Sequence, residues 1–536
     1  MKQKSVFSSL HASTNAHPFI FRLPTEILED IFIQCASDYH CEHDGRPRSA
    51  APSWVNVSYV CHRWRNVALN CATIWTYVFI TSQRWTEELL ARSRQASLKI
   101  RIWLLDESRW LNTVEKVMDH LERIQELRLD VPAPYNQQVL SKLSSRAPRL
   151  QNLEITLEDP SPEWPSLPFD GVPPALHTLE LTDCSVPLSS FKLNALTTLG
   201  LHYVPDQFKQ NIEEFLAVMG YMKDLKHLYL DQALASATGF LSSAVFRTFE
   251  KIDLPHLARL LIGAPLSTSL ALLSCVNIPL ETSVKLECDS EPDFPFDNHA
   301  LLCSLLTRKC SMAKGHALSS STILTLVINI FSAPTLTFSA YERDFTVVSD
   351  WDSNVPLQID LNLSEDDLDE DRITSNIFCS MSFSNVGSLF IIRPPFSPAF
   401  WRRMLGYFQD VRCIRLYAGN MPDLSVLSLT GLTTDEGVQN QDGLATGDRG
   451  QSHILAPRLE ELVLDRIIFL PERDYDLPEL AITRRSLLDS LSTRRGMHGR
   501  LTMTQCAIGN SDRFDSVMVW GDGKIHVICD SENNEE

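Results

Sequence analysis

The apolar positions of residues 23–75 fall into two stripes with the spacing of amphipathic helices. The first stripe consists of Ile27, Leu28, Ile31, Phe32 and Cys35. The second consists of Trp54, Val57, Val60, Cys61, Trp64, Val67 and Ala68. Residues three and four apart share one face of an α-helix, so this part of the chain is expected to contain two helices. Pro24 fits the first turn of the first helix, where a missing backbone N–H costs nothing.

A different pattern begins near residue 121 and recurs along the chain. It reads aliphatic, two residues, aliphatic, one residue, aliphatic, as in Leu150, Leu153 and Ile155. Six copies between residues 124 and 262 start 20 to 32 residues apart, and four more start at Val386, Val411, Leu424 and Leu459. The last two aliphatic residues of each copy lie on one side of a short strand, because strand side chains have a period of two.

Proline stands two residues before five of these ten copies, at Pro148, Pro174, Pro255, Pro422 and Pro457. With 29 prolines in 536 residues, chance accounts for roughly half of one such coincidence. We expect this proline to end a preceding helix and to set the extended chain that enters the strand. Residues 283–380 contain no clean copy of the pattern.

The helical segment resembles the F-box, the short module through which proteins attach to the Skp1 adaptor of cullin-RING ubiquitin ligases. The resemblance is carried by a Leu-Pro pair at 23–24 followed by Glu-Ile-Leu and Ile-Phe, by Val-Cys-x-x-Trp at 60–64, and by a closing Trp75. It implies that Skp1 is bound through Leu23, Pro24, Ile27, Leu28, Ile31, Phe32, Val60, Cys61, Trp64, Leu69 and Trp75. The link from Ser37 to Ser53 is longer and more polar than is usual in the family. Periodicity alone favours equally an amphipathic hairpin that opens an all-helical domain.

The recurring pattern resembles leucine-rich repeats, a family in which a Cys or Asn often stands three residues after the last aliphatic. Here that position is filled by Cys184 and, if Leu501 to Met503 form a final strand, by Cys506. The two resemblances imply an α/β fold, with a small all-α F-box module followed by an irregular leucine-rich-repeat solenoid that has a parallel concave sheet. The expected domains are a flexible N-terminus (1–17), the F-box (18–80), a helical linker (81–120), the repeat array (121–510) with a disordered insertion at 431–452, and a C-terminal hairpin with an acidic tail (511–536).

Composition and charge narrow the classes of partner. The chain has 67 acidic against 48 basic residues, a formal net charge of -19. Phosphate-rich partners require clustered cations, so we expect neither nucleic acid nor an anionic membrane as a partner. The thirteen cysteines have no paired spacing, which is typical of a reducing compartment. Because the first 18 residues also lack the apolar core of a signal peptide, we expect a cytoplasmic or nuclear protein.

Motifs of catalysis and metal binding are missing from the sequence. It contains no Gly-x-Ser-x-Gly, no phosphate-binding Gly-x-x-x-x-Gly-Lys and no His-Glu-x-x-His. Cys35, His40, Cys41 and His43 are zinc-type residues, but a buried Cys beside a surface loop is the favoured interpretation, because zinc needs four converging ligands. We therefore expect no enzyme, no metal and no cofactor.

The polar residues between the inward aliphatics face outward along the predicted sheet. An exposed polar row is needed for solubility in any repeat array, but exposed aromatics concentrate binding energy. We therefore select Tyr229, Asp231, Arg415 and Tyr417 as candidate substrate-binding residues. The predicted function is a substrate receptor of an SCF-type ligase that binds Skp1 through the F-box and an unknown target protein through the repeats. The alternatives are a non-degradative Skp1-bound adaptor and, with less support, an enzyme with an unrecognised site.

Overall fold

The computed structural model describes most of the chain up to residue 289 and a series of strands beyond it. The described residues are 23–42, 53–80, 82–103, 110–158, 168–171, 176–184, 193–279, 281–289, 325–330, 335–341, 357–362, 386–392, 411–417, 458–469, 498–508, 513–521 and 524–530, with a few single residues between them. The chain forms two compact units, residues 1–209 with 221–225 and residues 210–220 with 226–536. The expected flexible N-terminus, the insertion at 431–452, the repeat at Leu424 and the acidic tail after Asp530 lie outside the described residues.

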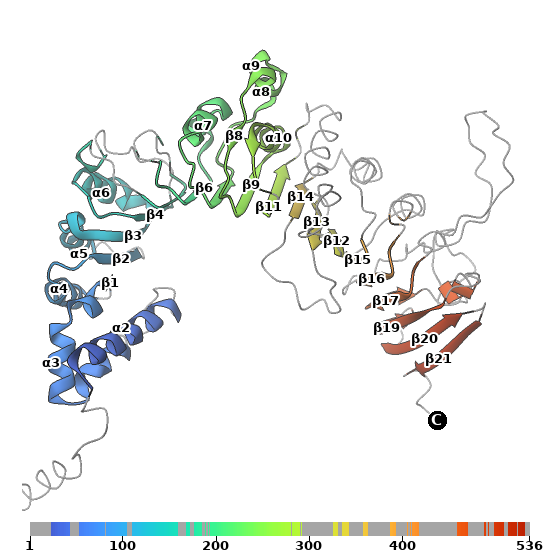
Figure 1. Ribbon diagram of the computed structural model, residues 1–536, viewed down its shortest axis with the longest axis horizontal. Helices are drawn as coiled ribbons and strands as arrows, with labels where there is room; N and C mark the ends of the chain where they lie inside the picture. Colours follow the sequence, from blue (N-terminus) through green and yellow to red (C-terminus); the bar gives the residue numbers. More distant parts are fainter. Residues whose placement is uncertain are drawn as a thin grey trace, which may run out of the picture. The chain divides into compact units, whose positions relative to one another are not determined.

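Unit 1 combines a helical module with a parallel sheet whose strands follow chain order (Figure 1). The strands, each paired in parallel with the next, are β1 (Tyr77–Phe79), β2 (Leu98–Trp103), β3 (Ile124–Val131), β4 (Asn152–Leu157), β5 (Thr178–Thr182) and β6 (Thr198–His202). The α-helices are α2 (Thr25–Glu42), α3 (His62–Asn70), α4 (Gln83–Arg92), α5 (Leu111–Met118) and α6 (Asn136–Ser141). The 3₁₀ turns are η2 (Ser53–Tyr59), η3 (Ala72–Trp75), η5 (Leu121–Arg123), η6 (Ala133–Tyr135), η7 (Lys142–Ser144), η8 (Pro168–Gly171) and η10 (Asp206–Phe208).

The expectation of a helical linker over residues 81–120 is wrong in one respect. Helices α4 and α5 are present, but Leu98–Trp103 form β2, which pairs with β1 on one side and with β3 on the other. Leu98, Ile100 and Ile102 are buried, and the residues between them are half-buried. This alternation has the period of a strand, so the sheet begins two strands before the first copy of the pattern.

Unit 2 contains a larger sheet. Its strands lie in the order β7 (His227–Asp231), β9 (Arg259–Pro265), β11 (Ser283–Asp289), β14 (Leu357–Asn362), β13 (Thr335–Tyr341), β12 (Thr325–Ile330), β15 (Ser388–Ile392), β16 (Cys413–Tyr417), β17 (Glu461–Asp465), β19 (His498–Ile508), β20 (Phe514–Gly521) and β21 (Lys524–Asp530). The helices are α7 (Ile212–Met219), α8 (Thr238–Ser242), α9 (Ala244–Thr248) and α10 (Leu266–Cys275). Short strands β8 (Ile252–Asp253) and β10 (Val276–Asn277) pair with each other, and β18 (Ile468–Phe469) pairs with β19.

The middle of this sheet departs from the expected parallel array. After β11 the spatial order runs backwards along the chain, from β14 through β13 to β12, before β15 resumes the forward order. Strand β13 is antiparallel to both of its neighbours, so β12, β13 and β14 form a meander between two parallel strands. Only four residues, 331–334, separate β12 from β13, too few for the crossover that a parallel pair requires. This insertion is the reason that residues 283–380 contain no clean copy of the pattern.

A tight turn precedes the strands and explains the recurrent proline. The backbone N–H of Leu150 donates to the Ala147 carbonyl at 3.2 Å. Pro148 therefore occupies the second position of a four-residue turn, where its fixed φ is favoured, and it does not end a helix as expected. Pro255 occupies the same place in its own turn. The equivalent bond, from a backbone N–H to the carbonyl three residues earlier, precedes the strands at Leu196, Leu225, Leu257 and Val411.

The strands also share one backbone conformation at their carboxyl ends. Five strands contain three outward-facing residues in alternation, and the residue directly after the third of these has a φ between 50° and 57°, namely Asp183, Tyr203, Gln232, Arg466 and Gln505. This left-handed region costs a residue with a side chain roughly 1–2 kcal/mol. Its recurrence at one position in both units shows that the repeats follow the same backbone path.

Cys184 and Cys506 occupy the next position and act alike in the two units. The Cys184 thiol donates to the Ile155 carbonyl at 3.8 Å, and the Cys506 thiol donates to the Leu464 carbonyl at 3.5 Å. Each carbonyl belongs to the preceding strand at the equivalent position, and both sulfurs are buried. The two cysteines therefore tie each turn to the strand before it.

The C-terminal end of unit 2 is antiparallel. Strand β19 pairs with β20, and β20 pairs with β21, both antiparallel. Gly499 in β19 permits the close approach of β20, because a Cβ there would lie 2.2 Å from the Trp520 ring and 2.6 Å from the Glu460 carbonyl oxygen.

The burial of the repeat cysteines predicts their reactivity. Burial raises the pKa of the Cys506 thiol to about 11, and it also raises the pKa of Cys184. Because the thiolate is the reactive form, both should resist iodoacetamide in the native chain at pH 8, and labelling of Cys506 should increase as the pH approaches 11. Exposed Cys35 is the internal control and should be labelled at pH 8. Mass spectrometry of tryptic peptides measures all three, and equal labelling of Cys35 and Cys506 at pH 8 would contradict the fold.

Candidate functional site

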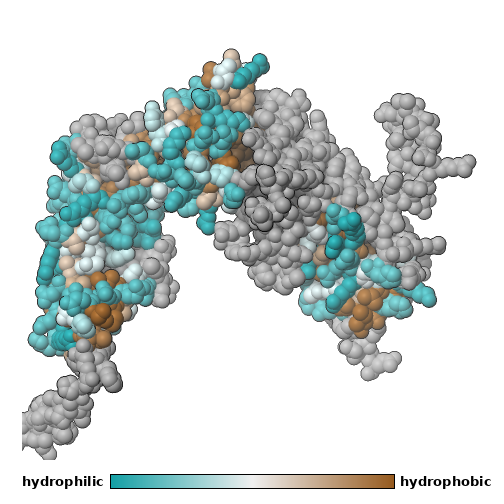
Figure 2. Space-filling model, viewed as in Figure 1, coloured by the Kyte–Doolittle hydropathy of each residue, from teal (hydrophilic) through white to brown (hydrophobic). Residues whose placement is uncertain are grey.

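Helix α2 divides its apolar stripe between the interior and the surface. Leu28 and Phe32, one turn apart, are buried, and the centroids of the Phe32 and Trp64 rings are 5.1 Å apart. Ile27 and Ile31, also one turn apart, remain 43% and 38% exposed. The stripe is therefore wider than the module's own core requires, and its outer half stays partly exposed. Figure 2 shows an apolar area over this helical module.

Helix α2 is also longer than its stripe. It continues to Glu42, so the first six residues of the Ser37–Ser53 link are helical. Cys35, expected on the buried face, is exposed. The side chains of His40, Cys41 and His43 lie outside the described residues.

The second stripe does not form one helix. It is divided into η2 and α3, and Cys61 between them has extended backbone (φ -158°). The Cys61 sulfur accepts the backbone N–H of Trp64 at 3.4 Å and so caps α3. Helical spacing cannot reveal this break, because Val60 and Cys61 are both apolar and keep the phase of the stripe.

Trp75 is the centre of the module's core. Its indole N–H donates to the Ala68 carbonyl at 2.8 Å, and its ring lies 5.2 Å from Trp54 and 6.3 Å from Trp85. The Arg92 guanidinium lies 4.3 Å from the ring centroid. Trp85 and Arg92 belong to α4, and β1 begins at Tyr77, two residues after Trp75. The Trp75 side chain therefore joins the module to the sheet of unit 1.

The eleven residues predicted to contact Skp1 therefore separate into groups. Leu28, Phe32 and Trp75 are buried in the module's own core, so their contact with Skp1 stays a prediction. Leu23, Cys61, Trp64 and Leu69 are half-buried. The exposed members are Pro24, Ile27, Ile31 and Val60. Tyr59, which lies off the helical stripe, is exposed beside Val60.

Arg63 positions the start of α2. Its guanidinium donates to the Leu23 carbonyl, 40 residues earlier in the chain. This bond connects α3 to the segment before Pro24, so it orders the end of the module at which two of the predicted contact residues lie. Arg63 carries no part of the apolar stripe, and the periodicity gave no reason to select it.

The four predicted substrate-binding residues do not come together. Tyr229 and Asp231 lie on β7, and Arg415 and Tyr417 lie on β16, with six strands of unit 2 between them. At about 4.8 Å per strand the two pairs are roughly 30 Å apart along the sheet. They belong to two separate surfaces.

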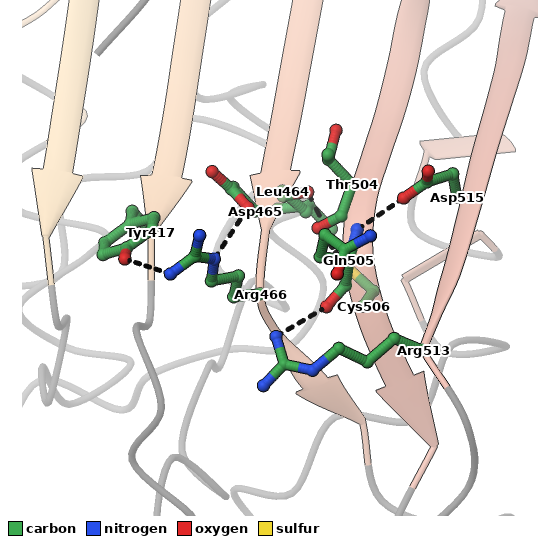
Figure 3. Close-up of polar contacts among 9 residues, drawn as sticks. All are labelled: Tyr417, Leu464, Asp465, Arg466, Thr504, Gln505, Cys506, Arg513 and Asp515. Atoms are coloured by element: carbon green, nitrogen blue, oxygen red, sulfur yellow. Dashed lines mark hydrogen bonds and ion pairs between the residues drawn. The ribbon is translucent and has the colours of Figure 1, made fainter. Parts of the chain in front are cut away.

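The β16 pair is largely engaged within the sheet. Arg415 is 17% exposed, and its guanidinium lies 5.2 Å from the Phe390 ring centroid and 3.7 Å from a Glu461 carboxylate oxygen. In Figure 3 the Arg466 guanidinium points toward Tyr417 and donates to its hydroxyl at 2.9 Å. Both side chains thus hold neighbouring strands together, which leaves the β7 pair as the more available surface.

A second polar group borders Tyr417 at the carboxyl ends of β17 and β19 (Figure 3). The Asp515 carboxylate accepts the backbone N–H of Gln505 at 2.6 Å, and Arg513 donates to the Gln505 carbonyl at 3.4 Å. These bonds hold Gln505 in its left-handed conformation. Burial raises the pKa of neighbouring Asp465, against the opposing effect of Arg466.

Neither a cluster of metal-binding side chains nor a membrane-spanning helix is present among the described residues. In that part of the chain no three His, Cys, Asp or Glu side chains gather as a metal site would require. Among the same residues, no helix has the length and apolar character to cross a bilayer.

Comparison with known proteins places one region of the chain. Residues 20–81 match the family model described as F-box-like, a range that contains α2, η2, α3, η3 and β1. No curated protein matches the chain. An F-box-like domain therefore lies in unit 1, and the described residues beyond it include helices and repeat-like strands in sheets that are mostly parallel.

The division of the α2 stripe predicts that two neighbouring substitutions lower stability by different amounts. Phe32→Ala removes a buried ring beside Trp64 and should cost about 3–5 kcal/mol. Ile31→Ala, one residue earlier and partly exposed, should cost less than about 1 kcal/mol. Urea titration of the full chain, followed by tryptophan fluorescence, measures the difference through the shift in transition midpoint. Equal shifts for the two variants would contradict this assignment of faces.

Proposed function

We propose that this chain is the substrate-recognition subunit of an SCF-type cullin-RING ubiquitin ligase. The F-box-like domain would dock on Skp1 through Leu23, Pro24, Ile27, Ile31 and Val60, and the two sheets would bind a target protein. The observation that carries the proposal is the uncovered half of the α2 stripe, within a region that matches the F-box-like model. Apolar side chains left exposed in this way are typical of a protein-binding surface.

The catalytic contribution of such a subunit is proximity. A target held on the sheets would share one complex with the ubiquitin-charged enzyme that Skp1 and the cullin recruit. A target lysine would then react at a high effective concentration, without any catalytic residue in this chain. We further propose that the strands are leucine-rich repeats. The shared pre-strand turn, the left-handed position and the two equivalent cysteine bonds support this assignment.

A cytoplasmic or nuclear location fits this role. The eight cysteines whose side chains the structure describes are free thiols, as a reducing compartment would keep them. The second candidate function is a non-degradative Skp1-bound adaptor, which would use the same F-box-like surface. An enzyme with an unrecognised site is the third candidate, and no motif in the sequence favours it.

Skp1 binding should depend on the exposed half of the stripe. The double variant Ile27→Glu with Ile31→Glu should weaken binding of purified Skp1 by more than about tenfold, because it places two charges in an apolar contact. Binding can be measured by biolayer interferometry, with circular dichroism to verify that the fold is intact. Val245→Glu, at another exposed apolar position, is the matched control and should bind normally. If the wild-type chain does not bind Skp1, the proposal fails.

Ubiquitin transfer separates the ligase from the adaptor. A pull-down of the wild-type chain from cells treated with a proteasome inhibitor should contain cullin and polyubiquitinated protein together with Skp1. The Ile27→Glu, Ile31→Glu variant should lose all three, because the cullin is reached only through Skp1. Skp1 without cullin or polyubiquitin would favour the adaptor.

A further inference from the structure

The outward face of β7, β9 and β11 in unit 2 combines an aromatic side chain with two carboxylates. The strand register places Tyr229 beside Leu261 and Leu261 beside Lys285. The next outward row places Asp231 beside Gly263 and Gly263 beside Glu287. All of these residues except Gly263 are half-buried, so their side chains are accessible from the sheet surface. We refer to these six residues as the β7–β11 surface.

Glycine at position 263 determines how Asp231 lies. A Cβ at this position would be 2.5 Å from the Asp231 Oδ1 atom and 3.3 Å from the Asp231 Cα atom. The Asp231 carboxylate therefore leans across β9, over the space that the missing side chain leaves. Glu287 belongs to β11, the strand on the opposite side of Gly263 from Asp231. The two carboxylates come from strands roughly 10 Å apart, and they flank the bare backbone between them.

An apolar platform borders the space over Gly263. The Tyr229 ring is nearly parallel to that of His227, with 6.3 Å between centroids and 18° between planes. Leu261 extends the platform onto β9 at the same height as Tyr229. An aromatic ring next to carboxylates attracts a cation from two directions, through its face and through the opposite charge.

Charge decides which partner the surface fits. An acidic segment would be repelled by Asp231 and Glu287. A wholly apolar segment would bury these carboxylates without a partner, which is costly. Lys285 already pairs with Glu287 at 2.6 Å, but a carboxylate accepts about four hydrogen bonds and so retains capacity for a further donor.

We propose that the β7–β11 surface binds a lysine or arginine side chain of the target protein, together with an apolar residue next to it. The basic group would lie over Gly263 between Asp231 and Glu287, and the apolar residue would pack on Tyr229 and Leu261. The proposal rests on the proposed function in one respect, because it assumes that the sheet of unit 2 binds the target protein.

Peptide binding tests this directly with the full chain in complex with Skp1. The probes are short fluorescent Gly/Ser peptides with a central Arg-Leu, Lys-Leu, Gln-Leu or Glu-Leu pair, measured by anisotropy. The two basic probes should bind about tenfold more tightly than the Gln-Leu probe, and the Glu-Leu probe most weakly. Equal binding of the basic and neutral probes would overturn the proposal.

Variants locate the binding on this surface. Asp231→Asn with Glu287→Gln should remove the tenfold preference for basic probes, while Glu213→Gln with Glu281→Gln removes the same charge at exposed positions elsewhere in unit 2 and should retain it. Lys285→Met frees Glu287 and should tighten binding of the Arg-Leu probe severalfold, a gain that misfolding cannot produce. Unchanged affinity in both the Asp231/Glu287 and the Lys285 variants would reject the site.

The outcome is independent of Skp1 binding. If the wild-type chain fails to bind Skp1, the peptide titration is repeated on the chain alone, and a basic preference that depends on Asp231 and Glu287 would still support the surface. If Skp1 binds but the preference is missing, the β7–β11 proposal fails and the proposed function remains.

Discussion

The structure of unit 1 depends on the burial of Trp75. Its ring is enclosed by Trp54 from the helical module and by Trp85 and Arg92 from α4, and its indole N–H is satisfied by the Ala68 carbonyl. The chain then enters β1 two residues later. The F-box-like domain and the first strands consequently share one core, so their relative orientation is fixed by packing and not by a flexible linker. A partner docked on the module would be held at a defined angle to the unit 1 sheet.

The sequence pattern predicted the elements better than it predicted their connections. Period two at Leu153 and Ile155 placed the strands correctly, because an aliphatic ridge must be buried on one side of the sheet. The break at Cys61 and the turn at Pro148 were not predictable in the same way. Both depend on local backbone hydrogen bonds, which leave no trace in the spacing of apolar residues. Strand β2 was missed because its alternation lay outside the longer repeat pattern that defined the array.

The candidate site was predictable as a segment but not as a surface. Ile27 and Leu28 are adjacent and equally apolar, yet one is exposed and the other is buried. Periodicity identifies the stripe, while the packing of α3 and η2 decides which half of it remains uncovered. The β7–β11 surface shows the same limit. Only the strand register places Gly263 and Glu287 beside Asp231, and the spacing of apolar residues does not predict that register.

The reversed meander in unit 2 has a consequence for how this chain folds during synthesis. In a simple array each repeat completes its contacts as soon as the next one emerges, so folding propagates along the chain. Here Val284 of β11 pairs with Leu357 of β14, 73 residues later, while β12 and β13 have already been made. At 5–20 residues per second the β11 edge waits roughly 4 to 15 s on the ribosome for its neighbour. Such an exposed strand edge is a template for wrong pairing, so the late arrival of β14 leaves β11 open to misfolding while the chain is being made.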